Sequence, residues 1–162
     1  LSPLSPAMQI GTSLDALRSF KGNLLILGAN ADAGGRLFNT KLAAFASKRE
    51  NARFMITLLH QEFLSWLAAA DILMGNSSSG IIEAASFHLP VLNIGERQRG
   101  RLRSGNVLDV PQDAAAIGRA LTKILHDTKL RARLRKAKNA YGDGRASERI
   151  VTILERALSS TS

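Results

Sequence analysis

The sequence predicts a single Rossmann-like α/β domain, in which a parallel sheet lies between two layers of helices. Short apolar runs alternate with amphipathic segments along most of the chain. The runs are short and continuous in apolar residues, as is typical of parallel strands that are covered on both faces. The chain has 162 residues, of which 45% are hydrophobic, and this is enough for one domain with a core of its own.

The expected strands are short apolar runs that stop at a glycine or a polar turn. The first, with the sequence LLIL, stops at Gly28, and the third ends at Gly75. Helical segments separate consecutive runs, so the strands should pair in parallel. Ligands of such sheets bind at the carboxyl ends of the strands, and the turns that follow the strands are therefore the expected site. The expected strands are residues 24–27, 53–57, 72–75, 90–94 and 107–110.

The expected helices carry apolar residues three or four positions apart, which places these residues on one face. Leu14, Leu17 and Phe20 follow this spacing and predict a first helix that closes near Gly22. The inner faces of the next two helices are expected at Leu37, Leu42, Ala43 and Phe45, and, within residues 61–70, at Phe63, Leu64, Trp66 and Leu67. Four further helices are expected at residues 79–87, 112–126, 127–138 and 145–158.

A run of hydroxyl side chains follows the third strand, in the segment GNSSSG at residues 75–80. Backbone N–H groups and hydroxyls at a strand-to-helix turn, together with the positive end of the helix dipole, can hold an anion such as phosphate. Helix capping is the alternative, because serine and asparagine are favoured cap residues. One cap residue would suffice, so the run favours an anion site at Ser77, Ser78 and Ser79.

Glu83 follows the serines on the same predicted helix, among small and apolar residues. A carboxylate in such surroundings is expected to be paired or hydrogen-bonded, unless it lies on an exposed face of the helix. In the first case it is within reach of a hydroxyl-bearing group next to the anion. A phosphate joined to a sugar is the natural ligand for this combination.

A polar loop with four alternating arginines follows the fourth strand, at residues 97, 99, 101 and 103. A guanidinium group suits a diphosphate, because it donates two parallel hydrogen bonds to oxygen atoms. Arg97 lies nearest the end of the strand and is the expected phosphate ligand. The other three are expected to contact water or another domain.

The positive charge of the chain is concentrated in its second part. The net charge is +9, with seven basic and six acidic residues before residue 95 and fifteen and seven after it. Much of the excess lies on a helical stretch, residues 129–138, which we interpret as a solvated helix face. A nucleic-acid-binding surface is the weaker alternative, because aromatic residues make up only 5% of the chain. We expect no nucleic-acid partner and, since no apolar run could span a bilayer, no membrane partner.

Other kinds of site find little support in the sequence. The glycines of GANADAGG, at residues 28–35, are not spaced as in a dinucleotide fingerprint or a P-loop, and a turn with Asp32 as a helix cap explains them. The three histidines are isolated and cysteine is absent, so no metal site is expected. Neither a Ser-His-Asp set nor a pair of carboxylates for acid–base chemistry is evident. We expect a binding half-site that has no cofactor and no catalytic group in this chain.

Four segments together carry a more specific signal. They are NADAGGR at residues 30–36, GNSSSGIIEA at 75–84, PVLNIGERQRGR at 90–101 and YGDGRAS at 141–147. In this order they resemble the hydrolysing UDP-N-acetylglucosamine 2-epimerases, enzymes that feed the synthesis of sialic acid and related nonulosonates. The resemblance extends from about residue 10 to residue 158 and is most specific between Asn76 and Arg101.

The resemblance implies a GT-B arrangement, in which two Rossmann-like domains face a cleft. Residues 1–162 would be the C-terminal nucleotide-binding domain, and the N-terminal domain would belong to a longer polypeptide. The start at Leu1, without an initiator methionine, agrees with this expectation. By resemblance, Ser77 and Ser78 hold the diphosphate, Arg97 binds a phosphate and Glu83 binds the ribose hydroxyls. Asn30 would line the nucleotide–sugar pocket, the backbone near Leu58 would meet the uracil, and Ser79 completes the expected UDP-binding residues.

The family reaction eliminates UDP from UDP-N-acetylglucosamine and then adds water, which releases N-acetylmannosamine. By resemblance, the substrate is a UDP-sugar, the catalytic carboxylates and histidine belong to the missing N-terminal domain, and the full-length protein is a cytoplasmic homo-oligomer. The alternative with similar chemistry is half of a GT-B glycosyltransferase, which would transfer the sugar to an acceptor instead. The basic nucleic-acid-binding module is the less favoured alternative.

Overall fold

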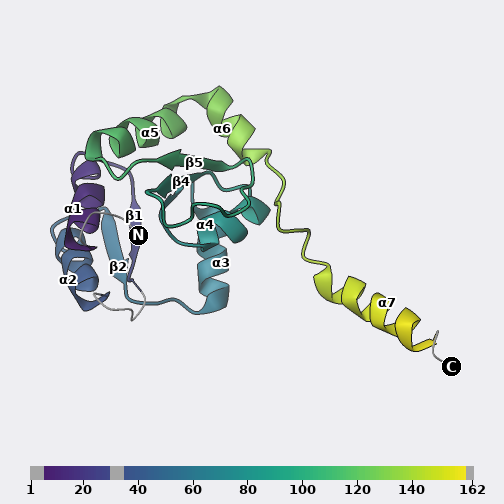
Figure 1. Ribbon diagram of the computed structural model, residues 1–162. Helices are drawn as coiled ribbons and strands as arrows, with labels where there is room; N and C mark the ends of the chain where they lie inside the picture. The colour runs from purple at the N-terminus through teal and green to yellow at the C-terminus, as the bar shows by residue number, and fades with distance from the viewer. Residues whose placement is uncertain (1–5, 30–34, 160–162) are drawn as a thin grey trace.

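The structure, a computed structural model, describes residues 6–29 and 35–159. Strands and helices alternate along these residues, as the sequence predicts (Figure 1). The strands are β1 (Leu24–Leu27), β2 (Ala52–Met55), β3 (Leu73–Gly75), β4 (Val91–Ile94) and β5 (Val107–Val110). The helices are α1 (Pro6–Ala16), α2 (Gly35–Ala46), α3 (His60–Ala69), α4 (Ser79–Ile82), the 3-10 turn η1 (Ala84–Phe87), α5 (Ala114–His126), α6 (Thr128–Arg135) and α7 (Ala146–Ser159).

All strand pairs in the described residues are parallel, which confirms the predicted pairing. β1 pairs with β2 in the register Leu24↔Ala52, while β3, β4 and β5 form a second ladder in this order. The single sheet that the sequence predicts is thus divided into two hydrogen-bonded ladders. Each strand is only three or four residues long, so each ladder rests on few hydrogen bonds and the helices must contribute much of the stability.

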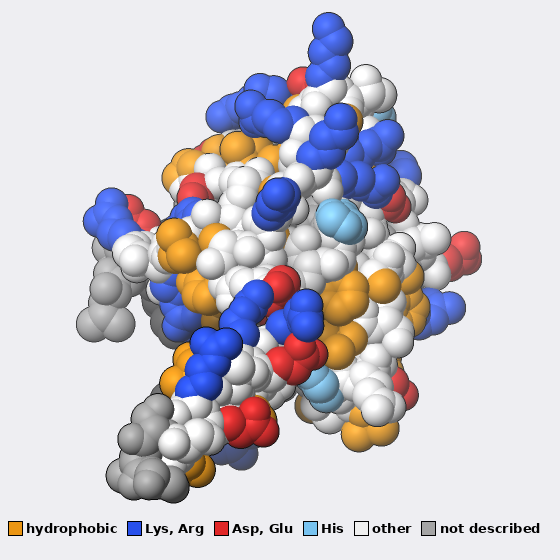
Figure 2. Space-filling view, turned by 90° about the vertical axis from the view of Figure 1, so that its right-hand side faces the viewer, with side chains coloured by type: hydrophobic (Ala, Val, Ile, Leu, Met, Phe, Trp, Pro, Cys, Tyr) orange, Lys and Arg blue, Asp and Glu red, His pale blue; other side chains and the backbone are white. Residues whose placement is uncertain are grey.

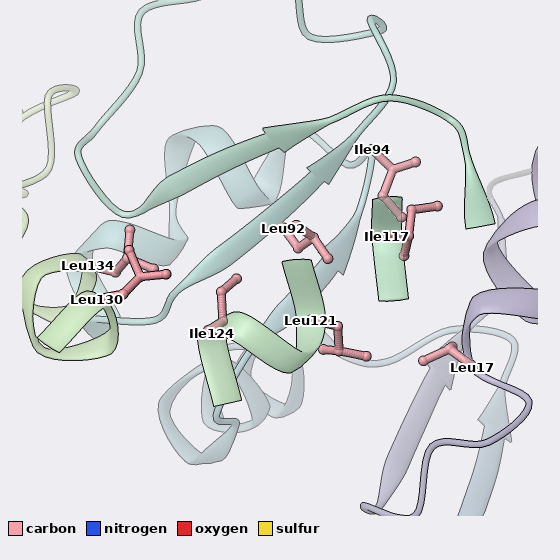
Figure 3. Packing of buried hydrophobic residues seen from close by; sticks show 8 residues of the cluster. All are labelled: Leu17, Leu92, Ile94, Ile117, Leu121, Ile124, Leu130 and Leu134. Carbon is pink, nitrogen blue, oxygen red and sulfur yellow. The ribbon is translucent and has the colours of Figure 1, made fainter. Parts of the chain in front are cut away.

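The strands of the second ladder lie between two hydrophobic clusters, because successive residues of a strand point to opposite faces. Leu92 and Ile94 of β4 face a cluster formed with α5 and α6 (Figure 3). Val91 of the same strand faces the other way, into a smaller cluster that includes Leu67 of α3 and Ala84 of η1. Helices therefore cover both faces of the ladder, as predicted for a Rossmann-like domain.

The first helix ends earlier than its apolar spacing predicts. α1 stops at Ala16, and the chain continues in tight turns in which Leu17 bonds to Leu14 and Phe20 to Leu17. The guanidinium of Arg49 then takes up the backbone carbonyls of Leu17, Arg18 and Phe20. This long-range contact satisfies backbone carbonyls of the turns between α1 and β1.

Two apolar side chains that were expected to be buried are exposed instead. The exposed fraction is 48% for Trp66 and 49% for Leu37. On α3, the neighbouring Leu67 occupies the inward position and is 3% exposed. The apolar stripe of a short helix is wider than its buried face, so sequence spacing alone does not identify the innermost residue.

The last helix differs from all others in its surroundings. α7 projects away from the body of the molecule at the end of an extended segment (Figure 1), and none of its fourteen residues is buried. Figure 2 views the molecule from the side of α6 and α7 and shows many Lys and Arg side chains gathered above α7. The Lys and Arg side chains of α6 are mostly exposed, in keeping with the predicted solvated helix face. No helix in the described ranges is both long enough and apolar enough to cross a membrane.

Candidate functional site

The serines lie where β3 gives way to α4, as predicted. We call residues 76–79 the serine turn. The hydroxyl oxygen of Ser77 accepts a hydrogen bond from the backbone N–H of Ser79 at 3.3 Å, and its hydroxyl lies 3.4 Å from that of Ser79. Ser78 occupies the position just before the helix, but its side chain makes no capping hydrogen bond. The side chain of Ser77 is therefore engaged within the turn, whereas the hydroxyl of Ser78 makes no capping bond and is available to a ligand.

The helix after the serine turn is shorter than predicted. The expected helix 79–87 breaks at Glu83 into α4, of four residues, and the 3-10 turn η1. Ser86 bonds back to Glu83 and His88 to Ala85, three residues apart in each case, so the second half is more tightly wound. A one-turn helix has a small dipole. Anion binding at this corner must therefore rest on hydroxyl and N–H groups rather than on a long helix.

Close packing fixes the position of α4 against the sheet. A Cβ atom at Gly80 would lie 2.9 Å from a methyl group of Val91 in β4, which is too close for any residue larger than glycine without displacement of that side chain. Gly80 and Ile81 are buried accordingly. The serine turn thus lies on a well-packed support, whose place in the sheet is set by β3 and β4.

Glu83 lies at the junction of α4 and η1 and is half-buried. Among the described residues, no ion pair or side-chain hydrogen bond to its carboxylate is present. The sequence leaves open a paired carboxylate or an exposed one, and the structure shows an intermediate case. A half-buried carboxylate with free acceptor oxygens can take the hydroxyl groups of a sugar.

Of the four alternating arginines, Arg97 is the one whose side chain reaches the serine turn. Its Nη1 lies 3.4 Å from the carbonyl oxygen of Asn76. Arg99 instead pairs with Glu96 at 2.8 Å, and Arg103 pairs with Asp109 at 2.9 Å. Arg97 is exposed, so its remaining N–H donors can reach a bound diphosphate.

Gln98, the neighbour of Arg97, is a part of this site that the sequence analysis missed. It is only 3% exposed, and its Nε2 donates a hydrogen bond to the carbonyl of Asn76 at 2.7 Å. The only sequence signal is its place in the RQRGR segment, where an uncharged side chain between arginines is free to turn inward.

The remaining predicted residues are not joined to the serine turn. Asn30 lies outside the described residues. Leu58 is half-buried beyond the end of β2, and within the described ranges no hydrogen bond connects it to residues 76–79. The same ranges contain no cluster of three His, Asp or Glu side chains that could hold a metal ion. The structure therefore brings together Ser77, Ser78, Ser79, Glu83 and Arg97 around one corner of the sheet.

The chain is similar to known proteins both in sequence and in structure. The profile of the family described as UDP-N-acetylglucosamine 2-epimerase matches residues 4–155. The hydrolysing UDP-N,N'-diacetylbacillosamine 2-epimerase of Legionella pneumophila is 38% identical over 148 residues, which is 91% of this chain and 38% of that protein. The polysialic acid biosynthesis protein P7 of Escherichia coli is 35% identical, over 87% of this chain and 36% of that protein.

Solved structures agree on the fold. The UDP-GlcNAc 2-epimerase of Neisseria meningitidis, solved with UDP-GlcNAc, superposes with a TM-score of 0.72 at 18% identity, over 93% of this chain and 41% of that one. MnaA of S. aureus, solved with UDP, gives 0.74 at 21% identity, over 97% and 43%. The chain therefore has the expected Rossmann-like architecture, and it spans less than half the length of the proteins that it matches.

Proposed function

The chain belongs to the UDP-N-acetylglucosamine 2-epimerase family, and from this premise we propose that it is the UDP-binding, C-terminal half of a hydrolysing UDP-sugar 2-epimerase. The reaction is UDP-N-acetylglucosamine and water to N-acetylmannosamine and UDP, in the cytoplasmic synthesis of sialic acid or a related sugar. One observation carries the proposal: the serine turn, Glu83 and the side chain of Arg97 meet at the carboxyl end of β3.

The geometry supports a role for each of these residues. The hydroxyl of Ser78 and the exposed guanidinium of Arg97 would hold the diphosphate, with Ser77 and Ser79 shaping the turn. The free carboxylate of Glu83, one helical turn further on, would accept the ribose hydroxyls. Asn30 at the sugar pocket and the backbone of Leu58 at the uracil complete the proposed set on the strength of the family alone.

These residues favour departure of the UDP group. Negative charge builds up on the diphosphate as the bond from the sugar to UDP breaks, and fixed donors around this charge stabilise the transition state. Removal of the C2 proton needs a base within hydrogen-bond reach. Glu83 is assigned to the ribose, so we propose that base and acid come from the N-terminal domain of the same polypeptide.

The exposed apolar face of α7 supports a missing domain. Ile150, Ile153, Leu154 and Leu158 are 55–72% exposed on this helix. A helix of fourteen residues is marginal in water unless its apolar face is covered. We propose that the N-terminal domain covers this face and that the full-length protein forms a homo-oligomer.

Calorimetric titration of the 162-residue chain with UDP tests the half-site. We expect weak binding, since half of the cleft is absent. Ser78→Ala should lower the affinity for UDP about tenfold, and Arg97→Ala should lower it about ten- to a hundredfold. Arg99→Ala is the matched control, because this arginine lies in the same loop but pairs with Glu96. Equal losses for Arg97→Ala and Arg99→Ala, or no binding by the unaltered chain, would contradict the proposal.

Activity is tested on the longer polypeptide that contains this chain. Incubated without an acceptor, it should release the 2-epimerised free sugar and UDP, whereas a glycosyltransferase would need an acceptor. UDP-N-acetylglucosamine and UDP-N,N'-diacetylbacillosamine should be compared, because a relative is named for the second sugar. Turnover by residues 1–162 alone would refute the assignment of the base to the missing domain.

A further inference from the structure

Gln98 is buried inside the loop that carries the exposed Arg97. Its Nε2 donates to the carbonyl oxygen of Asn76 at 2.7 Å, which is a well-formed hydrogen bond, whereas the contact of Arg97 with the same oxygen is 3.4 Å. Asn76 is the first residue of the serine turn. Gln98 therefore makes the stronger of the two links between the loop and the turn.

A chain of polar contacts holds Gln98 from the side of the sheet. Asn93 of β4 and Asp109 of β5 are register partners, and Nδ2 of Asn93 donates to Asp109 at 2.6 Å. The second oxygen of Asp109 accepts from Nε of Arg103 at 2.9 Å. Nη1 of Arg103 in turn donates to the backbone carbonyl of Gln98 at 3.1 Å. The contacts run without interruption from two paired strands to the serine turn.

A gain in stability does not explain why Gln98 is buried. Its Oε1 is buried and, among the described residues, meets no hydrogen-bond donor. An acceptor buried without a partner opposes folding, and an apolar side chain of the same length would avoid this cost. The carboxamide donates the hydrogen bond to the carbonyl of Asn76, which an apolar side chain could not do.

We propose that Gln98 is a positioning residue, which acts through the carbonyl of Asn76 to hold the serine turn in the conformation that presents its hydroxyl and N–H groups to a diphosphate. Asn93, Asp109 and Arg103 hold Gln98 in place. The nature of the ligand rests on the proposed function, but the effect of Gln98 on the conformation of the turn does not.

The test uses Gln98→Met in the 162-residue chain, because methionine keeps the length of the side chain and removes both the donor and the orphan oxygen. We expect the affinity for UDP to fall about tenfold, the equivalent of one lost hydrogen bond, while the melting temperature stays the same or rises. Without ligand, the backbone amide resonances of residues 77–79 should shift and their hydrogen exchange should accelerate.

Asn106→Leu is the matched control. Asn106 is also a fully buried carboxamide whose nitrogen donates to a backbone carbonyl, that of Leu89 at 2.8 Å, and whose oxygen lacks a donor. It lies at the opposite, amino end of β4 and β5. Its substitution should leave UDP affinity and the amides of residues 77–79 unchanged, whatever it does to the melting temperature.

Unaltered turn amides in Gln98→Met overturn the proposal, as does an affinity within twofold of the unaltered chain. If Gln98→Met does not fold, Arg103→Met replaces it. The amide resonances of residues 77–79 should then shift in the same direction but by less. If the unaltered chain does not bind UDP, the proposed function fails, while the amide comparison still decides whether Gln98 positions the turn.

Discussion

Helices α5 and α7 have nearly the same apolar spacing and opposite surroundings. On α5, Ile117 and Ile124 are 0% exposed and pack into the main core (Figure 3). On α7, Ile150 and Ile153 occupy the corresponding stripe and are 57% and 64% exposed. A periodic pattern thus shows that a helix has an apolar face, but not that its partner lies within the same stretch of chain.

The two helices also differ in how their N-termini are held. Asp113 caps α5, since its carboxylate accepts from the backbone N–H of Ala116 at 2.7 Å. α7 begins beside Asp143, which accepts from the N–H of Arg145 at 3.1 Å and forms a two-pronged ion pair with Arg149 at 2.8 Å. Tertiary packing stabilises α5 in addition to its cap, whereas α7 depends on such local contacts.

The largest difference should come from truncation of matched isoleucines. Ile117→Ala should lower the free energy of unfolding of the chain by about 2–4 kcal/mol, because it removes buried methyl groups and leaves a cavity. Ile153→Ala on α7 should change it by less than about 0.5 kcal/mol. Urea denaturation measures both, and equal losses would show that α7 packs on the body of the chain in solution.

The second prediction transfers the same substitution to the proposed longer polypeptide, which would include the N-terminal domain. If the N-terminal domain covers α7, Ile153→Ala should there cost about 1–3 kcal/mol, the value of burying an aliphatic side chain. Lys138→Ala, a change on the solvated stretch before α7, is the control and should have little effect in either protein. A cost for Ile153→Ala that stays near zero in the longer protein would remove the proposed contact.

A smaller effect is expected at the N-terminus of α5. Asp113→Ala removes the cap and should lower the free energy of unfolding by about 1 kcal/mol. Asp15→Ala is the comparison, because the side chain of Asp15 forms an exposed ion pair with Arg18. If the two substitutions had the same effect on urea denaturation, the cap at Asp113 would be of no consequence.

The smallest effect concerns pH and is confined to α7. The hydrogen bonds from the side chain of Arg149 and from the backbone of Arg145 lower the pKa of Asp143 to about 2, from 3.8. A carboxylate with a depressed pKa stabilises the folded form above its unfolded pKa and loses this contribution as the pH falls through the folded value. The helix content of α7 should therefore decrease between about pH 4 and pH 2.

Carbon-detected NMR titration of the Asp143 carboxyl group measures this pKa directly. Arg149→Met should return it towards the ordinary value and abolish the pH dependence of α7 between these limits. Because the pair is exposed, added salt should weaken the effect in the unaltered chain. A pKa near 3.8 in the unaltered chain would show that the ion pair does not persist in solution.

Strand positions were predictable because each strand is a short, mainly apolar run between helical segments. All five lie within about two residues of their expected bounds. Helix ends were less predictable, since contacts from distant residues set them. Arg49, more than thirty positions further along the chain, donates to backbone carbonyls of the turns that follow α1, and nothing near Ala16 in the sequence indicates that contact.

Five of the residues that the sequence predicts for the UDP site, Ser77, Ser78, Ser79, Glu83 and Arg97, lie around one corner of the sheet, and their role in UDP binding stays a prediction. Serines after an apolar strand and an arginine after the next strand signal an anion site by composition. Gln98 has no such signal, because its role depends on a backbone carbonyl twenty-two positions away. The break of the predicted helix at Glu83, where the hydrogen bonds change to the three-residue spacing of η1, also has no signal in the sequence.

Local pattern was sufficient for the class of fold and the order of its elements, because apolar period is a property of neighbouring residues. Tertiary contacts determined which apolar faces are buried, where each helix stops and which polar side chains support the serine turn. These outcomes depend on pairs of groups far apart in the chain. The interactions between these groups contribute to stability only once the fold has brought the groups together.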